Sequence, residues 1–209
     1  MLDTKGAWEV KGKRGEMNAY AQLVCWLGPR YVLRGLLIPN PGGKTDFTDI
    51  DLLFLHASGI YVMEVKDWAG RFYVDERQED WKYVIPDWDK GCNRDQRSSP
   101  LNQNGTHVRA LRKLFGDEHC ALPIHPIAVF TDERCRIIRL DYPWEKPVIY
   151  LRDLRAAIEG TAQENGNRLL PGHVEHLYNC LEPWANPPEE RRRLHIEQVK
   201  KLREGIQRG

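Results

Sequence analysis

The stretch IDLLFLHASGIYVMEVK, residues Ile50–Lys66, decides the fold. It contains two apolar runs on either side of the short turn segment HASG at 56–59. Both runs are short, bounded by turn residues, and largely without the polar alternation of a half-exposed strand, which favours strands buried on both faces. The stretch therefore predicts a β-hairpin in the interior of an α/β domain.

The register of this hairpin follows from its turn. Symmetric closure over HASG pairs Leu55 with Ile60 and places Asp51 opposite Glu64. Opposed residues on antiparallel strands have Cβ atoms roughly 5 Å apart. Two carboxylates at that separation can share one hard cation, and without a cation they repel each other until one takes up a proton. The hairpin thus predicts a pair of acids that bind a metal ion.

Lys66 adds a positive charge at the same place. Alternation along the strand puts Glu64 and Lys66 on one face and turns Val65 toward the core. Burying three charges among apolar residues is costly unless they are paired or bind metal. The alternative is a hairpin end at the surface, with Lys66 as a solvated charge. We favour the buried site because the strands are apolar on both faces.

These residue types suit phosphodiester hydrolysis. That reaction needs a metal ion that lowers the pKa of a water molecule and neutralises the phosphate oxygens. Asp51, Glu64 and the carbonyl of Val65 would hold the ion. Lys66 would orient the attacking water or stabilise the growing negative charge, or act as a general base if its pKa were lowered.

The flanking sequence completes an α/β pattern. Apolar residues spaced by three and four predict helices, and short apolar runs between turn residues predict strands. Ser99-Pro100 predicts a helix N-cap followed by proline in the first turn. The expected helices are Arg14–Leu27, Pro100–Phe115, Leu151–Glu159 and Gly172–Leu181; the further expected strands are Tyr31–Pro39, Arg71–Val74, Trp81–Ile85, Ile124–Phe130 and Val148–Tyr150, with a loop at 86–100.

An ordered set of motifs over about residues 12–130 resembles the nuclease-related domain (NERD) of the PD-(D/E)xK superfamily. In that superfamily two acids and a lysine form the site, here Asp51, Glu64 and Lys66. Three other motifs match along the strands and the first helix: G-x-x-G-E at Gly12–Glu16, I-D at Ile50-Asp51, and G-I-x-V-x-E-x-K at Gly59–Lys66. After the last of these the family has a polar residue, an aromatic residue and a glycine, here Asp67, Trp68 and Gly70. The motif N-P-x-x-Q, which opens a helix in the family, corresponds to Ser99–Gln103.

The resemblance implies a restriction-endonuclease-like core, which is a mixed central sheet flanked by helices on both faces. It implies Mg²⁺-dependent cleavage of nucleic acid, with DNA favoured as the substrate and RNA left open, with Mn²⁺ as a substitute ion and with bacterial defence as a fitting role. Glu16 would approach the metal from the first helix, and Gln103 would line the site. The alternatives are a first-turn acid favoured by the helix dipole for Glu16 and a surface amide for Gln103.

Two positions depart from the family pattern. Asp49 stands where the family usually has Gln, and the expected register places it opposite Lys66. It could pair with the lysine and weaken it, or be a further acid beside the metal. Ser99 replaces the usual Asn, which exchanges one helix cap for another.

The overall charge gives no pull toward a polyanion. Lys and Arg number 31 against 30 Asp and Glu, for a net charge of +1, so a nucleic acid has to be held by a local patch. Arg109, Arg112 and Lys113 form a basic helix face that is either solvated or in contact with phosphates. The tryptophans of this region, Trp68, Trp81 and Trp88, are expected to pack rather than to stack on bases.

The five cysteines are odd in number, widely spaced and without a C-x-x-C pair. This argues against a disulfide framework and for a reducing compartment. The first residues contain no apolar run typical of a signal peptide, and no stretch is long enough to cross a membrane. We expect a cytoplasmic protein without a membrane partner.

The composition changes after residue 182. We expect a nuclease domain at 1–182 and a charged, net-basic helix or linker at 183–209, which could bind nucleic acid, bind a partner or lead into a fused domain. The sequence leaves open whether a homodimer forms to cut both strands of a duplex. Two other functions remain open: a catalytically weak nucleic-acid-binding module, and a partner-interaction module of a larger multidomain protein.

Overall fold

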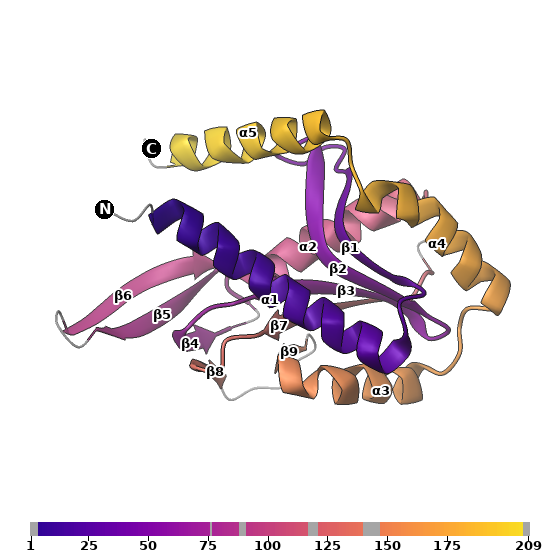
Figure 1. Ribbon diagram of the computed structural model, residues 1–209, viewed down its shortest axis with the longest axis horizontal. Helices are drawn as coiled ribbons and strands as arrows, with labels where there is room; N and C mark the ends of the chain where they lie inside the picture. The colour runs from indigo at the N-terminus through magenta and orange to yellow at the C-terminus, as the bar shows by residue number, and fades with distance from the viewer. Residues whose placement is uncertain (1–3, 76, 88–90, 117–120, 140–146, 207–209) are drawn as a thin grey trace.

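The computed structural model describes residues 4–75, 77–87, 91–116, 121–139 and 147–206. The α/β fold expected from the sequence is confirmed. The elements are α1 (Thr4–Leu27), β1 (Val32–Pro39), β2 (Phe47–His56), β3 (Gly59–Lys66), β4 (Gly70–Val74), β5 (Asp80–Asp87), β6 (Gly91–Ser98), α2 (Pro100–Leu114), β7 (Ile124–Phe130), β8 (Cys135–Arg139), β9 (Val148–Tyr150), the 3₁₀ turn η2 (Leu151–Asp153), α3 (Leu154–Asn165), α4 (Pro171–Ala185) and α5 (Glu189–Ile206) (Figure 1).

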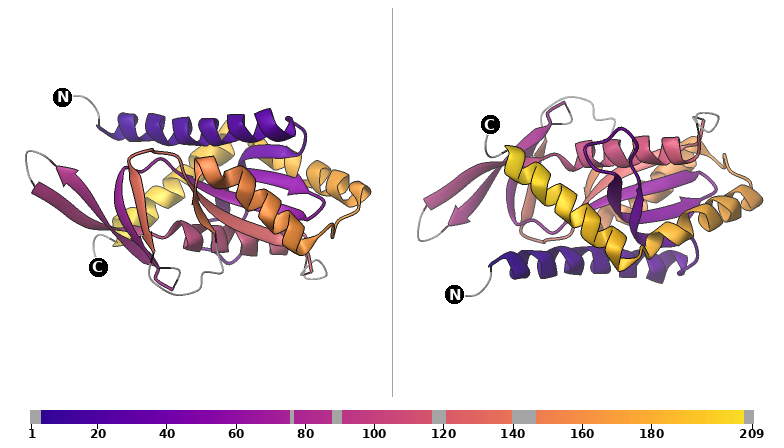
Figure 2. Two further views of the ribbon diagram at one scale, coloured as in Figure 1. Left: turned by 90° about the horizontal axis from the view of Figure 1, so that it is seen from below. Right: turned by 90° about the horizontal axis from the view of Figure 1, so that it is seen from above.

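The strands that the structure describes form two mixed sheets. The main sheet has the order β1-β2-β3-β7-β9, antiparallel from β1 to β3 and parallel from β3 to β9. Its β2–β3 ladder pairs Leu55 with Ile60, so the predicted register is confirmed. The second sheet has the order β6-β5-β4-β8, and its β5–β6 hairpin projects from the body of the molecule (Figures 1 and 2).

Helices cover both faces of the main sheet, as the expected core requires. Figure 2 shows the sheet between α1 on one side and α2 on the other. Burying aliphatic and aromatic side chains in these two layers is the main driving force for the fold. On one face Leu23 and Ile158 belong to the same apolar cluster as Tyr61 and Met63, and on the other face Leu111 and Leu177 belong to the cluster of Leu55 and Val62.

Two strands were missed from the sequence. Strand β6 lies inside the segment 86–100 that was predicted to be a loop, and β8 follows β7 at Cys135–Arg139. The β6 sequence, GCNRDQRS, is polar and carries no strand pattern. Its conformation comes from pairing along β5 over Asp80–Asp87, a tertiary effect that outweighs local propensity.

Helix α1 is longer than predicted. The helix was expected to begin at Arg14, but it begins at Thr4 and contains 24 residues. The apolar pattern fades before Arg14, so the first turns of α1 could not be predicted from it. Glu16 therefore lies in the middle of the helix, and the alternative reading of Glu16 as a first-turn acid does not apply.

Helix α5 folds back onto the β1–β2 hairpin. Helix α4 continues through Pro183 to Ala185, so the boundary expected at residue 183 falls inside it. The Gln198 side chain then donates to Asp46 Oδ2 at 2.6 Å and accepts the Asp46 amide at 3.0 Å. Seen from above, α5 crosses between α1 and α2 (Figure 2, right). None of the helices in the described ranges is long and apolar enough to cross a membrane.

Candidate active site

The hairpin opens at the candidate acids. The β2–β3 ladder runs as far as the Leu52–Met63 pair, and Asp51 and Glu64 follow one step beyond it. There the Asp51 carboxylate, rather than a strand carbonyl, accepts the Val65 amide, at 2.7 Å. On the other side of β2, Gly35 of β1 has a φ of +61°, a conformation that favours glycine, and lies between two regular β1–β2 pairs. Asp51 is the β2 residue between these two pairs, so it lies across from Gly35 on one side and accepts the Val65 amide of β3 on the other.

Glu64 is the centre of a hydrogen-bonded chain. It is 3% exposed, and its Oε1 forms an ion pair with Lys66 Nζ. Its Oε2 accepts from His107 Nε2 at 2.9 Å, and His107 Nδ1 lies 2.8 Å from Thr48 Oγ1. Since an ionised carboxylate only accepts, the proton of a neutral imidazole is on Nε2, and Nδ1 accepts the threonine hydroxyl proton. The strand acid is therefore held from both sides.

The charges of Glu64 and Lys66 stabilise each other. Burial alone would raise the pKa of Glu64, but Lys66 and His107 outweigh it and lower this pKa from 4.5 to about 2. Burial alone would lower the pKa of Lys66, but the charges of Glu64 and Asp51 outweigh it and raise this pKa above 10.5. Lys66 is thus a cation at neutral pH, which suits stabilisation of negative charge rather than the general-base role.

The other acids lie in an unfavourable field. Burial, followed by the charge of Glu64, raises the pKa of Asp51 well above 3.8. Burial, followed by the charges of Asp49 and Glu64, raises the pKa of Glu16. Acids that raise one another's pKa in this way are stabilised as carboxylates when a cation binds between them.

The donor set fits a magnesium ion. In the described part of the chain, no group of three or more His, Cys, Asp or Glu side chains converges on one metal position. Asp51 and Glu64 therefore stand as a two-carboxylate pair, with Glu16 nearby rather than clustered with them. Mg²⁺ is usually held by one or two carboxylates, with waters and substrate phosphates completing its octahedron. A zinc or calcium cage would need more protein ligands than these.

Asp49 faces α5 rather than Lys66. It pairs with Leu37 of β1, and the β2–β3 ladder ends before it could meet Lys66, whose ion-pair partner is Glu64. Desolvation raises the pKa of Asp49, and the charges of Arg192 and His195 partly oppose that rise. The alternative in which Asp49 pairs with Lys66 is therefore not the contact that forms.

Most of the residues expected to line the site or to contact nucleic acid from α2 border a cleft beside this helix. Gln103, Arg109 and Lys113 line a cleft of about 760 Å³ between α2 and the β1–β2 turn, and Arg112 lies outside its lining. Thr48, the hydrogen-bond partner of His107, also lines this cleft. Gln103 is exposed on α2.

The tryptophans pack, as expected. The Trp68 ring stacks on Phe72 with 5.2 Å between centroids, and Lys66 Nζ lies 5.4 Å from its centre. Trp81 is fully buried and donates from its indole nitrogen to the Asp75 carbonyl. Trp88 lies outside the described residues.

His107 and Thr48 were missed from the sequence. The apolar residues of α2 do not by themselves mark its buried face, since Val108 is only half-buried. The residues that are buried include Asn104 and His107, between Leu101 and Leu111. The available signal was a histidine four residues before Leu111 on an apolar face.

A family model matches the part of the chain that contains the candidate site. The family model described as nuclease-related domain, NERD, matches residues 11–131, more than half of the chain. The chain belongs to this family. The matched segment contains every acid and lysine of the candidate site together with Gln103 and His107, and it leaves α3, α4 and α5 outside.

The chain is also similar to a bacterial protein. An uncharacterised protein of Bacillus anthracis is 28% identical over 176 residues, which cover 82% of this chain and 75% of the relative. No solved structure matches the chain. The relative extends the similarity beyond the NERD segment and carries no statement of activity.

Gly15 of the NERD helix signature allows α1 to approach the site. A Cβ atom there would lie 2.7 Å from Thr131 Oγ1 and 2.9 Å from the Asp67 Cβ. We expect Gly15→Ala to lower the free energy of unfolding by about 1–3 kcal/mol because α1 must shift, and to displace Glu16 with it. Urea denaturation measures the change.

Gly12→Ala is the matched control. It lies in the same helix, and nothing stands within 4 Å of its added Cβ. Alanine is a better helix former than glycine by about 1 kcal/mol, so this variant should be as stable as the wild type or more stable. Equal effects of the two substitutions would contradict the close approach at Gly15.

Proposed function

We propose that this NERD domain is a Mg²⁺-dependent nuclease of the PD-(D/E)xK type, with DNA as its substrate. The observation that carries the proposal is the pair Asp51 and Glu64 at the open end of a buried hairpin, with the Lys66 ammonium beside them. The pKa of Asp51 is raised, the pKa of Glu64 is lowered, and both lie beside the Lys66 cation. Strongly shifted pKa values of this kind cluster at functional sites. We further propose the cytoplasm and defence against foreign DNA as its setting.

Each side chain has a role in this proposal. Asp51 and Glu64 would hold Mg²⁺ together with the Val65 carbonyl, and Mn²⁺ would substitute. The bound ion would lower the pKa of a water molecule and neutralise phosphate oxygens. Lys66, as a cation, stabilises negative charge that develops on the phosphate. Glu16, on α1, adds a negative charge that helps to raise the pKa values of Asp51 and Lys66.

The cleft beside α2 suits the phosphate backbone. Arg109 and Lys113 lie on one of its walls, and Lys113 already donates to the Pro41 carbonyl at 2.5 Å. Gln103 lines the same cleft and is neutral. Basic side chains at such a wall fix the position of a strand without reading its bases.

The test is cleavage of a labelled double-stranded oligonucleotide under single-turnover conditions. We expect product with Mg²⁺ or Mn²⁺ and none with excess EDTA. DNA retained in a gel-shift experiment without any cleavage would contradict the proposal and favour a module that only binds nucleic acid. Self-association or partner capture that depends on residues 183–209, again without cleavage, would favour an interaction module.

His107 is expected to act through Glu64. Replacing it with alanine leaves Glu64 Oε2 and Thr48 without their partner, so we expect cleavage to fall about 10–100-fold, as for other residues that orient metal ligands. His107→Gln keeps a donor for Glu64 and should recover part of that loss. The readout is the Mn²⁺ dissociation constant, which His107→Ala should raise while His107→Gln raises it less. Equal affinities for Mn²⁺ in all three proteins would exclude the positioning role.

A further inference from the structure

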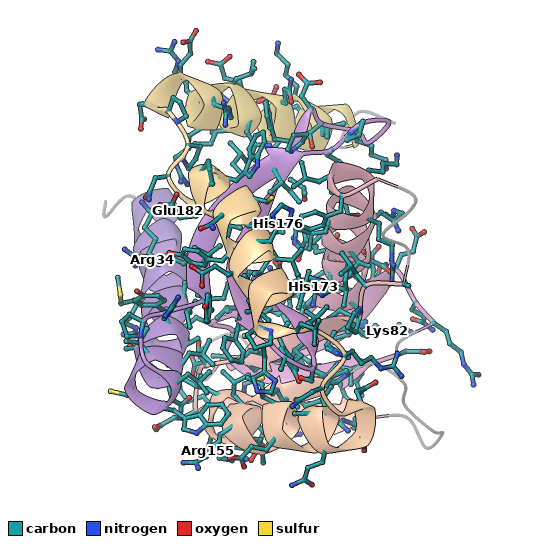
Figure 3. The ribbon with its side chains drawn as sticks, turned by 90° about the vertical axis from the view of Figure 1, so that its right-hand side faces the viewer. Arg34, Lys82, Arg155, His173, His176 and Glu182 are labelled. Carbon is teal, nitrogen blue, oxygen red and sulfur yellow. The ribbon has the colours of Figure 1, made fainter. Side chains whose placement is uncertain are left out.

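A second cleft, of about 540 Å³, shares no lining residue with the α2 cleft. Residues of α1, β1, α4 and α5 line it. Figure 3 shows Arg34 between α1 and α4, with Glu182 near it. Glu16 also lines this cleft, so the cleft opens directly beside the candidate site. We name it the α1–α4 cleft.

Three cations from different elements line the α1–α4 cleft. They are Lys13 of α1, Arg34 of β1 and Arg192 of α5. The Arg34 guanidinium lies 5.2 Å from the centre of the Tyr20 ring and 3.3 Å from Met17 Sδ. Within the described residues no carboxylate lies within ion-pairing distance of Arg34. Because the Tyr20 ring and the Met17 thioether are uncharged, they do not neutralise Arg34, and its positive charge can attract an anionic ligand.

Two tyrosine rings complete the lining. Tyr20 and Tyr178 are half-buried, and Tyr178 packs edge-on against Tyr31 with 5.6 Å between centroids. Sites for single-stranded nucleic acid combine cationic side chains, which contact the phosphate backbone, with aromatic rings, on which the bases stack. A volume of about 540 Å³ lies within the range of pockets for small ligands, so it accepts one or two nucleotides and not a duplex.

Helix α5 forms one wall of this cleft and lies outside the NERD segment. Arg191 stacks on Phe47 and Trp184, and Gln198 bonds to Asp46, but no described side chain of α5 is fully buried. Polar contacts at a surface stabilise by only about 0–1 kcal/mol each. The described contacts of α5 are thus mainly those of polar side chains, and Arg192 lies on the side of the helix that lines the cleft.

We propose that the α1–α4 cleft binds an unpaired stretch of nucleic acid next to the phosphate that is cleaved. The proposal rests on the proposed function in taking nucleic acid as the ligand, but binding in the cleft does not require cleavage. Arg34 and Lys13 contact phosphates, Tyr20 and Tyr178 contact bases, and Arg192 closes the cleft from α5. The preferred substrate then carries a single-stranded end, flap or gap at the site.

The test measures binding of fluorescent 12-mers by anisotropy, with Ca²⁺ in place of Mg²⁺ and a gel to check that the oligonucleotides stay intact. Full-length wild type is compared with Arg34→Ala and with Arg155→Ala, an exposed arginine of α3 that lines neither cleft. We expect Arg34→Ala to weaken binding of oligo(dT) about tenfold and to lower its salt dependence by about one ion. Arg155→Ala should bind as the wild type does.

The arms of this experiment separate the possible results. Loss of affinity in Arg34→Ala for oligo(dT) or oligo(U), but not for a blunt duplex of the same length, supports the proposal and tells which strand is preferred. Unchanged affinity for both unpaired strands, or an equal loss for the duplex, overturns it. Binding of oligo(dT) in this cleft does not require cleavage. Arg34-dependent binding in a protein that never cleaves DNA would therefore contradict the proposed function alone.

Discussion

Replacing Lys66 with alanine is expected to slow Mg²⁺-dependent cleavage at least about 100-fold, as does removal of one group that stabilises a charged transition state in other enzymes. The side chain is 14% exposed and directed at Glu64, and its pKa is raised above 10.5 despite burial. It therefore carries a fixed positive charge at the point where negative charge would develop on the phosphate. The measurement is the single-turnover rate at saturating Mg²⁺.

The same substitution should also destabilise the fold. Removing one partner of a buried ion pair costs about 3–5 kcal/mol, and His107 still contacts Glu64, so we expect the lower end of that range. Lys82→Ala, at an exposed position of β5, is the control and should change neither rate nor stability. A Lys66→Ala protein that remains folded and cleaves at the wild-type rate would show that the lysine is only structural.

Asp51→Asn should separate stability from activity. The amide oxygen of asparagine can still accept the Val65 amide, so the local backbone is kept. The variant loses an anionic metal ligand, which is worth several kcal/mol in metal-assisted catalysis, so we expect cleavage to fall at least about 100-fold. It also removes a carboxylate that the folded protein holds in an unfavourable field.

The pH dependence of this second effect has a definite sign. Burial and Glu64 raise the pKa of Asp51 above its unfolded value of 3.8, so ionised Asp51 disfavours the folded state. The cost is absent below about pH 3.8 and grows as the pH rises through the raised pKa. Without metal, Asp51→Asn should therefore match the wild type in acid and exceed its melting temperature near neutral pH.

Glu64 gives the opposite trend. Its pKa is lowered from 4.5 to about 2, so its contribution to stability is present above pH 4.5 and is lost as the pH falls toward 2. That loss is common to the wild type and Asp51→Asn, so the difference between them isolates Asp51. Mg²⁺ at 100 times its dissociation constant should stabilise the wild type by about 2.7 kcal/mol and the variant much less. Equal stabilisation by Mg²⁺ would place the ion elsewhere.

The sequence was sufficient where local pattern and final structure agree. The hairpin register came from the turn at 56–59, and the Leu55–Ile60 pair followed. Ser99 was predicted as the cap of α2, and its hydroxyl accepts the Leu101 amide at 3.2 Å. Helices on both faces of a mixed sheet were implied by the resemblance to the NERD family, and the continuous apolar runs agree with strands buried on both faces.

It was insufficient where distant parts of the chain set the result. Strand β6 is polar and exists through pairing with β5. The β2–β3 ladder ends at the Leu52–Met63 pair, and Asp49 pairs with Leu37 of β1, so the predicted opposition of Asp49 and Lys66 is wrong. The return of α5 to the hairpin, through Gln198 and Asp46, involves residues 152 positions apart. No periodicity or motif encodes contacts of this kind.

The central claim is that Asp51, Glu64 and Lys66 form a metal-dependent nuclease site, and its most direct test is cleavage of supercoiled plasmid by three proteins purified in parallel. Wild type, Asp51→Asn and Lys66→Ala are each incubated with Mg²⁺, with Mn²⁺ and with EDTA. The account predicts nicked or linear plasmid from the wild type with either metal, and intact plasmid from both variants and from all EDTA reactions. No cutting by the wild type, or equal cutting by all three proteins, would contradict it.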